Sequence, residues 1–171
     1  RQLLLREPDA ESQKLEALCG IARDFDVLVT FNGKSFDVPL LQTRLTLCRI
    51  RAPLCAAHID LIHPARRIYR LRIESCSLGN IESRVFSAPR QGDIDGAEIP
   101  GRYYRYLRSG DESLLADIVS HNRRDIVTMP LLAAAMCRAL DAPQNAGEAA
   151  DRFSIGRYYL RQRDAQSAQA Y

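Results

Sequence analysis

Hydrophobic and polar positions along the first 61 residues predict strands and helices in alternation. Short runs of strand-forming residues occupy 1–5, 26–31 and 57–61, and the second run is uncharged after its first residue. Between them, apolar residues recur at helical spacing over 9–24 and 39–48. This alternation predicts an α/β domain whose three strands share one sheet. The uncharged strand is typical of one that is buried on both faces.

The next part of the chain has a mostly helical pattern. Residues 78–85 predict a small helix, and residues 87–96 contain the proline and glycine of a surface loop. Residues 111–140 predict one or two helices, of which 112–139 should pack on the sheet. Pro130 should kink or divide this segment, because proline removes a backbone donor.

A change in composition near residue 141 predicts a boundary between two domains. Residues 141–148 are mostly small and polar, as in a linker. The tail that follows resembles the start of a tetratricopeptide repeat, which is an α-hairpin. We therefore expect one domain over 1–140, followed over 141–171 by a linker and tetratricopeptide-like helices that are a possible contact for a protein partner.

Overall composition is that of a globular chain. Of the 171 residues 46% are hydrophobic, and no run approaches the roughly 18 apolar residues of a membrane span. We expect a soluble, cytoplasmic protein with no membrane partner. The five cysteines include no C-x-x-C pair that would suggest zinc or redox chemistry, so reduced, mostly packed thiols are expected.

Arginine supplies almost all of the positive charge. The chain has 22 arginines and two lysines, and the arginine excess is concentrated between Arg44 and Arg108. Guanidinium groups suit bidentate contacts with phosphate, so the excess favours a nucleic-acid partner. An ordinary solvated surface rich in arginine is the alternative.

The strongest local signal is the segment TFNGKSFDVPLL. Here the uncharged strand ends at Asn32, and Asp37 starts the next helix. A carboxylate just past the carboxyl end of a buried strand is where α/β folds place ligand and metal chemistry. We expect Phe36 to pack beneath the loop and Asn32 to fix the turn or contact a substrate. By structure alone, Asp37 could instead be a helix N-cap.

A second carboxylate occurs in the segment SHNRRDIVTM. Asp125 lies four residues after His121, so both side chains share one face of a predicted helix. A carboxylate can hold a divalent cation while an imidazole one turn away orients or deprotonates a water molecule. A surface pair within a run of charges is the alternative interpretation.

Taken together, these two segments resemble the second and third exonuclease motifs of the DEDD superfamily. More closely, five segments in order are similar to the bacterial YprB-like branch of RNase H-like exonuclease domains: LVTFNGKSFDVPLL, HIDLIHPARRIYR, SCSLGNIE, DIDGAEIP and SHNRRDIV. The resemblance covers about residues 1–140. It implies an RNase H-like mixed sheet flanked by helices, and 3′–5′ hydrolysis of the phosphodiester bonds of DNA or RNA.

The resemblance also implies a site in which four acids gather two Mg²⁺ or Mn²⁺ ions. Asp37 and Asp125 carry over as metal ligands, and His121 as the residue that positions the attacking water. The spacing of His121 from Asp125 has three intervening residues, as in the tyrosine subclass of the family, whereas the histidine subclass has four. By family position, Arg66, Arg67 and Arg70, with Arg72 behind them, are candidates for phosphate contacts. A solvated helix face is the alternative for these arginines.

One family motif, D-x-E on the first strand, does not occur in this chain. Asp24-Phe25-Asp26 closes a helix before the strand of the second motif, so it does not match. RQLLL corresponds to the third strand of the family, and two strands are therefore expected upstream. The sheet should be incomplete, with an open edge or a substitute partner at 26–31, and the fragment should be inactive by itself.

A histidine-rich segment, HIDLIH, offers another arrangement. His58, Asp60 and His63 could form a metal cluster. The preferred interpretation is that Asp60 ends a strand and supports the site from behind its metal ligands. The main alternative to an exonuclease is a non-catalytic module that binds nucleic acid or another protein. An upstream D-x-E motif would favour the enzyme.

Overall fold

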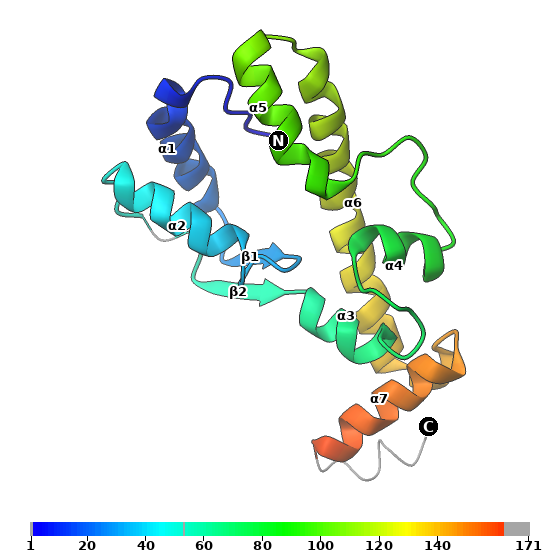
Figure 1. The fold of residues 1–171 in the computed structure, drawn as a ribbon. Helices are drawn as coiled ribbons and strands as arrows, with labels where there is room; N and C mark the ends of the chain where they lie inside the picture. The colour runs from blue at the N-terminus through cyan, green and yellow to red at the C-terminus, as the bar shows by residue number, and fades with distance from the viewer. Residues whose placement is uncertain (1, 53, 163–171) are drawn as a thin grey trace. The chain divides into compact units, whose positions relative to one another are not determined.

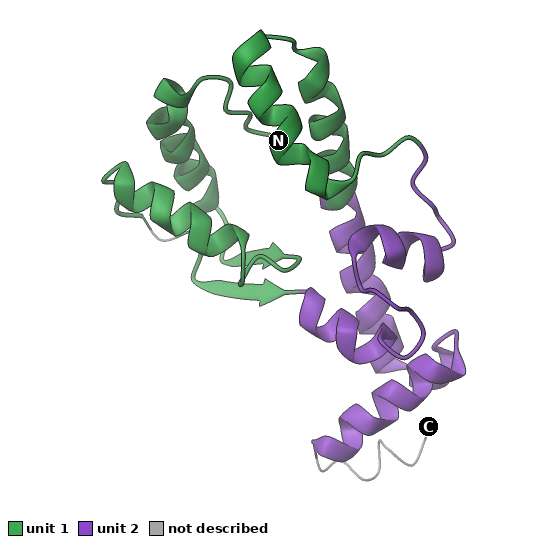
Figure 2. Ribbon diagram, viewed as in Figure 1, with its two compact units in different colours: residues 1–60, 92–125 green, residues 61–91, 126–171 purple. Residues whose placement is uncertain are grey.

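The computed structural model describes residues 2–52 and 54–162. The chain divides into two compact units. Unit 1 is drawn from residues 1–60 and 92–125, and unit 2 from residues 61–91 and 126–171 (Figure 2). This division by compactness differs from the domain boundary expected near residue 140, which stays a prediction. No helix of the described residues is long and apolar enough to cross a membrane.

Unit 1 contains a small parallel sheet. Strand β1 (Val27–Thr30) pairs with β2 (Ala57–Asp60) from Val27↔Ala57 to Thr30↔Asp60. Parallel strands need a crossover, which here contains α2 (Asp37–Leu47) (Figure 1). The prediction that 26–31 and 57–61 share a sheet is confirmed. In the described residues β1 pairs with β2 alone, so its other edge is open as expected.

The burial expected for the uncharged strand is wrong. Val27 and Val29 of β1 are 41% and 42% exposed, and Ile59 of β2 is 51% exposed. The β-branched residues of β1 favour an extended backbone, whereas their burial depends on what covers the faces of the sheet. Among the described residues, these side chains keep much of their surface accessible.

Helix α1 (Glu11–Ala22) packs against α2. Leu15 and Cys19 of α1 form a buried cluster with Leu45 of α2. Beside this cluster, Arg44 donates two hydrogen bonds to the carboxylate of Glu11, and these bonds hold the pKa of Glu11 below its ordinary value. The helix predicted over 9–24 is confirmed, preceded by a short 3₁₀ helix (Pro8–Ala10).

Two further helices belong wholly or partly to unit 1. They are α5 (Ile99–Ser109) and the first part of α6 (Ser113–Asp141). Helix α6 confirms the helix predicted over 112–139 and runs through Pro130 without division. Because Pro130 has no N–H, the carbonyl of Ile126 loses its usual helical partner.

The strand expected at 1–5 is wrong for the described residues 2–5, which have no regular structure. Gln2 donates through Nε2 to the carbonyl of Val119, at 3.0 Å. The carbonyl of Leu5 accepts from the hydroxyl of Tyr103, also at 3.0 Å. An apolar run becomes a strand only where its backbone pairs with another strand. Here side chains of the segment and of α5 make the long-range hydrogen bonds instead.

Unit 2 is helical and buries many apolar side chains. Its helices are α3 (Ile62–Tyr69), α4 (Leu78–Arg84), the second part of α6, and α7 (Ala149–Arg161). Helix α3 packs against α7. Ala65, Ile81 and Leu132 are fully buried, and Ile155 of α7 is 1% exposed. Polar groups are also buried here, since Glu82 pairs with Arg90 and accepts a hydrogen bond from Thr128.

The segment expected to be a linker contains a 3₁₀ helix, Pro143–Asn145. Pro143 and Ala146 are buried, because small apolar side chains fit between closely packed backbones. Helix α7 corresponds to the first helix of the expected C-terminal α-hairpin. The second helix of that hairpin falls on residues 163–171, which lie outside the described residues.

Candidate functional site

The loop after β1 is fastened to the end of β2 by Asp60. The carboxylate of Asp60 accepts hydrogen bonds from the backbone N–H groups of Asn32, at 2.7 Å, and Lys34, at 2.9 Å. Asp60 is 5% exposed. Two charge-assisted bonds in a buried setting hold a turn strongly. Asp60 therefore ends its strand beside the N-x-x-x-F-D segment, while its role toward a metal stays a prediction.

The same turn approaches the end of β1 closely. A Cβ atom added to Gly33 would lie 2.5 Å from Cβ of Thr30, so only glycine fits at this position. The hydroxyl of Thr30 makes a 2.8 Å hydrogen bond with Nε2 of His58. His58 and Asp60 are thus both engaged with the turn and its strand. This arrangement does not favour the alternative metal cluster of His58, Asp60 and His63.

In the loop after β1, Asn32 agrees with its predicted role, whereas Phe36 does not. Asn32 adopts a left-handed backbone with φ of 65°, which asparagine tolerates better than most residues, and this agrees with a turn-fixing role. Phe36 is 70% exposed, so the expectation that it packs beneath the loop is wrong. The turn is held by Asp60 and Gly33 instead of an aromatic side chain. A contact of Asn32 or Phe36 with a substrate stays a prediction.

Asp37 is the first residue of α2 and is exposed. The helix has no side-chain cap bond at its N-cap position, which is Phe36. Within the described residues, the carboxylate of Asp37 makes no hydrogen bond or ion pair. The alternative interpretation of Asp37 as a capping residue therefore has no support. A negative charge in the first turn is nevertheless favoured by the helix dipole.

On α6, the imidazole of His121 lies between two carboxylates. Its Nδ1 is 3.0 Å from Oδ2 of Asp93, and its Nε2 is 3.5 Å from Oδ2 of Asp125. Nη1 of Arg124 lies 3.4 Å from Oδ1 of Asp93. The side chains of His121 and Asp93 are 15% and 11% exposed, and that of Asp125 is 30% exposed. The structure thus brings together two of the predicted site residues, His121 and Asp125.

Asp93 is a site residue that the pattern of the sequence did not reveal. It lies in the loop before the 3₁₀ helix Gly96–Glu98, in the segment DIDG, which was interpreted as surface loop and as part of the family resemblance, without a role for Asp93. Two closely spaced aspartates beside glycines were the available signal. That signal is weak, because such residues are also typical of ordinary turns.

The predicted site therefore consists of two local clusters within unit 1. One cluster surrounds the turn after β1 and includes Asp37 and Asp60, and the other surrounds His121. A shared metal site for Asp37 and Asp125 stays a prediction. In the part of the chain that the structure describes, no group of three or more His, Cys, Asp or Glu residues is arranged to hold a metal ion.

The candidate phosphate-binding arginines lie in or just after α3, and their surroundings differ. Arg66 and Arg70 are exposed and make no hydrogen bond or ion pair with a described residue. The guanidinium of Arg67 lies 5.0 Å from the ring centroid of Tyr158, a cation–π distance. Arg72 instead donates to Asp151 and to the carbonyl of Arg84. Arg66 and Arg70 are consequently the most available of the four.

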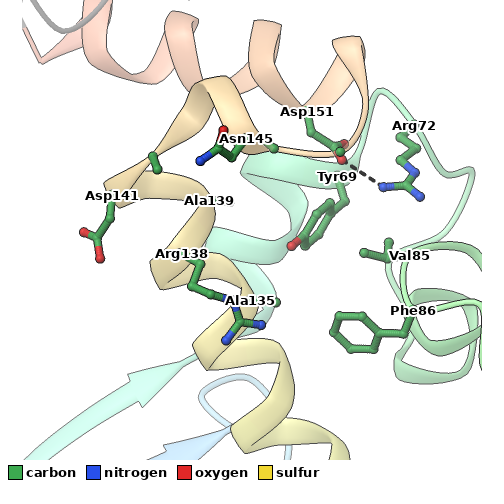
Figure 3. A pocket seen from close by; sticks show the side chains of 13 residues that line it. Tyr69, Arg72, Val85, Phe86, Ala135, Arg138, Ala139, Asp141, Asn145 and Asp151 are labelled. Carbon is green, nitrogen blue, oxygen red and sulfur yellow. Dashed lines mark hydrogen bonds and ion pairs between the residues drawn. The ribbon is translucent and has the colours of Figure 1, made fainter.

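Unit 2 also contains a cavity of about 560 Å³ (Figure 3). Its lining includes Tyr69, Phe86, Arg138 and Asp151, with Arg72 paired to Asp151. Burial raises the pKa of Tyr69 to about 12 and also raises that of Asp151, against the opposing effect of Arg72. Oδ1 of Asp151 has no hydrogen-bond partner among the described residues. No pattern in the sequence indicated this cavity.

Comparison with known families decides the classification. Residues 1–137 match the profile of the RNase_H superfamily, which is more than half of the chain. The chain belongs to the RNase_H superfamily. This membership agrees with the RNase H-like fold expected from the sequence, of which the structure shows a small parallel two-stranded sheet and many helices.

A curated relative of this RNase_H superfamily chain is "Uncharacterized protein YprB" of Bacillus subtilis (strain 168). It is 28% identical over 171 residues, which covers 98% of this chain. The chain spans 41% of the length of that relative. No solved structure matches the chain.

Members of the superfamily usually use divalent metal ions. The carboxylates of Asp37 and Asp125 have the oxygen donors that Mg²⁺ and Mn²⁺ prefer. However, the described residues assemble no group of three or more ligands.

Proposed function

We propose that this chain is part of a metal-dependent 3′–5′ exonuclease that hydrolyses phosphodiester bonds in DNA or RNA. The observation that supports this most is the pair of His121 and Asp125 on one face of α6, in a chain of the RNase_H superfamily. An imidazole beside a carboxylate can orient a water molecule by accepting a hydrogen bond from it.

Asp37 is the second carboxylate of the proposal. Its support is its placement just past the end of β1, its exposure, and the absence of a hydrogen bond or ion pair with described residues. Asp60 would keep Asp37 in place indirectly, because it fixes the turn that precedes α2. Mg²⁺ or Mn²⁺ bound with additional ligands would supply Lewis-acid chemistry at the scissile phosphate.

We also propose that Arg66 and Arg70 contact the phosphate backbone, with Arg67 as a weaker contributor. Both side chains are exposed and without ion-pair partners in the described residues, and arginine suits phosphate oxygens. Replacing Arg66 and Arg70 by Glu should weaken binding and lower the salt slope by about one unit for each lost contact. An unchanged slope would identify these residues as an ordinary solvated surface.

The exonuclease proposal is tested with the natural full-length protein and a 5′-labelled oligonucleotide in Mg²⁺. The parent should shorten the labelled oligonucleotide from its 3′ end, and a blocked 3′ terminus should prevent this shortening. Asp37→Asn and Asp125→Asn should each reduce the rate by about 100-fold or more, since a lost metal ligand removes several kcal/mol of transition-state stabilisation. Asp117→Asn is the control, because this α6 carboxylate pairs with Arg102 at the surface.

Three outcomes separate the candidate functions. If both variants degrade the oligonucleotide as fast as the parent, the proposed role of Asp37 and Asp125 is wrong. If the parent binds nucleic acid but degrades neither DNA nor RNA, the non-catalytic binding module replaces the exonuclease. Degradation that begins from internal positions would retain nuclease activity but contradict the 3′–5′ direction.

A further inference from the structure

We infer that Asp93 is a positioning residue that fixes the tautomer of His121, with the proton on Nδ1 and Nε2 left as an acceptor on the Asp125 side. The use of that acceptor rests on the proposed function. The tautomer itself is a property of the chain and is measured without substrate or metal.

The first support is the competition between the two carboxylates for one proton. A neutral imidazole has a single N–H, and either Asp93 or Asp125 can accept it. The contact with Asp93 is 3.0 Å, a normal hydrogen-bond distance, whereas the contact with Asp125 is 3.5 Å and lies at the outer limit. Asp93 is also less exposed than Asp125, at 11% against 30%, which strengthens its hydrogen bond. The proton therefore belongs on Nδ1.

The second support is that neighbouring groups hold Asp93 in its orientation. Oδ1 of Asp93 lies 3.4 Å from Nη1 of Arg124, while its Oδ2 faces His121. Two residues further along, Oδ1 of Asp95 accepts from the backbone N–H of Ala97 at 2.9 Å, which caps the 3₁₀ helix Gly96–Glu98. The carboxylate of Asp93 is thus contacted by Arg124, and the loop is anchored on its C-terminal side by Asp95.

The third support is the small residue near the other ring nitrogen. A Cβ atom added to Gly96 would lie 4.0 Å from Nε2 of His121, so Gly96 is close to this nitrogen. The loop thus places a carboxylate at Nδ1 and a residue without a side chain near Nε2. With Nδ1 bonded to Asp93, Nε2 can accept a hydrogen bond from a water molecule. The opposite tautomer would present a donor there.

The test reads the proton directly. Long-range ¹H–¹⁵N NMR spectra of the chain, with the ring neutral, distinguish a protonated from an unprotonated ring nitrogen for each histidine. We expect His121 to carry its proton on Nδ1. In Asp93→Asn, Asp125 keeps the one carboxylate at the ring among the described residues, so the proton should move to Nε2. Asp117→Asn should leave the His121 signals unchanged.

Kinetics of the full-length protein add a second readout. Asp93→Asn should lower kcat by about 10- to 100-fold with little change in KM, which is the usual cost of losing a carboxylate that orients a histidine. Asp93→Glu, which keeps the charge and the acceptor, should recover part of that loss. A purely structural role would not produce a shift of the proton together with rescue by Glu.

Each outcome decides the inference. A parent spectrum with the proton of His121 on Nε2 overturns it, and this result needs no variant that folds. A tautomer that is the same in the parent and in Asp93→Asn also overturns it. An unchanged kcat beside the expected spectra overturns the proposed use of Nε2 and supports the tautomer assignment alone. If the spectra change as expected but the parent has no nuclease activity, the tautomer assignment is supported and the proposed function fails.

Discussion

The two compact units differ in what they bury. In unit 2, Ala65, Ile81 and Leu132 are fully buried, and the ion pair of Glu82 and Arg90 is largely excluded from water. In unit 1, the large hydrophobic side chains of Val29 and Ile59 remain about half exposed on the sheet. Unit 2 thus has the more complete core, although both units come from one chain of fairly even composition.

The two units also differ in how they use their polar side chains. In unit 2, Thr128 and Arg90 satisfy the buried carboxylate of Glu82. Oδ1 of Asp151 is the exception, because it has no hydrogen-bond partner among the described residues. Unit 1 keeps Asp37 exposed and Asp125 30% exposed, and it uses Asp60 and Asp93 to hold a turn and an imidazole. A site that must admit substrate cannot bury all of its polar groups. The proposed chemistry is therefore located in the unit with the less complete core.

The largest expected effect compares matched leucines in the two cores. Leu132→Ala should lower the free energy of unfolding by about 4 kcal/mol, because fully buried neighbours cannot close the cavity. Leu45→Ala should cost about 2 kcal/mol, because partly buried neighbours such as Leu41 and Leu54 can move inward. Urea unfolding followed by circular dichroism measures both. Equal losses would remove the proposed difference between the cores.

A smaller effect is expected at the turn after β1. Gly33→Ala should cost about 2 kcal/mol, because its Cβ would collide with Thr30 and force the turn away from Asp60. The matched control is Gly79→Ala in α4, where a Cβ meets nothing within 4 Å. That substitution should leave stability unchanged or raise it by up to about 1 kcal/mol. If Gly33→Ala were as well tolerated as the control, the turn would not be held as described.

The smallest expected effect concerns the buried tyrosine of unit 2. Burial raises the pKa of Tyr69 from 10.0 to about 12, and the charge of Asp151 adds to the shift. The folded state therefore favours the neutral phenol. Its contribution to stability is complete below pH 10 and is lost as the pH rises toward 12. Between pH 9 and pH 11, the parent should lose about 1 kcal/mol more stability than Tyr69→Phe. The same loss in both proteins would contradict the shift.

Local sequence patterns predicted a large part of this molecule. The helices at 11–22 and 113–141 and the two paired strands follow from the spacing of apolar residues and from β-branched runs. His121 and Asp125 could be placed together because four positions on a helix form one turn. Local propensity and helical periodicity act over a few residues, so a single sequence is sufficient to recognise them.

Tertiary structure alone decided which distant groups meet. Asp60 and Asn32 are 28 positions apart, and so are Asp93 and His121, yet each pair forms a hydrogen bond. Tertiary structure also left residues 2–5 without a strand partner and the side chain of Val29 exposed. Such outcomes depend on which backbone or side chain lies opposite after the chain has folded. Local preference cannot specify them, because the free energy of each contact exists only once its distant partner is in place.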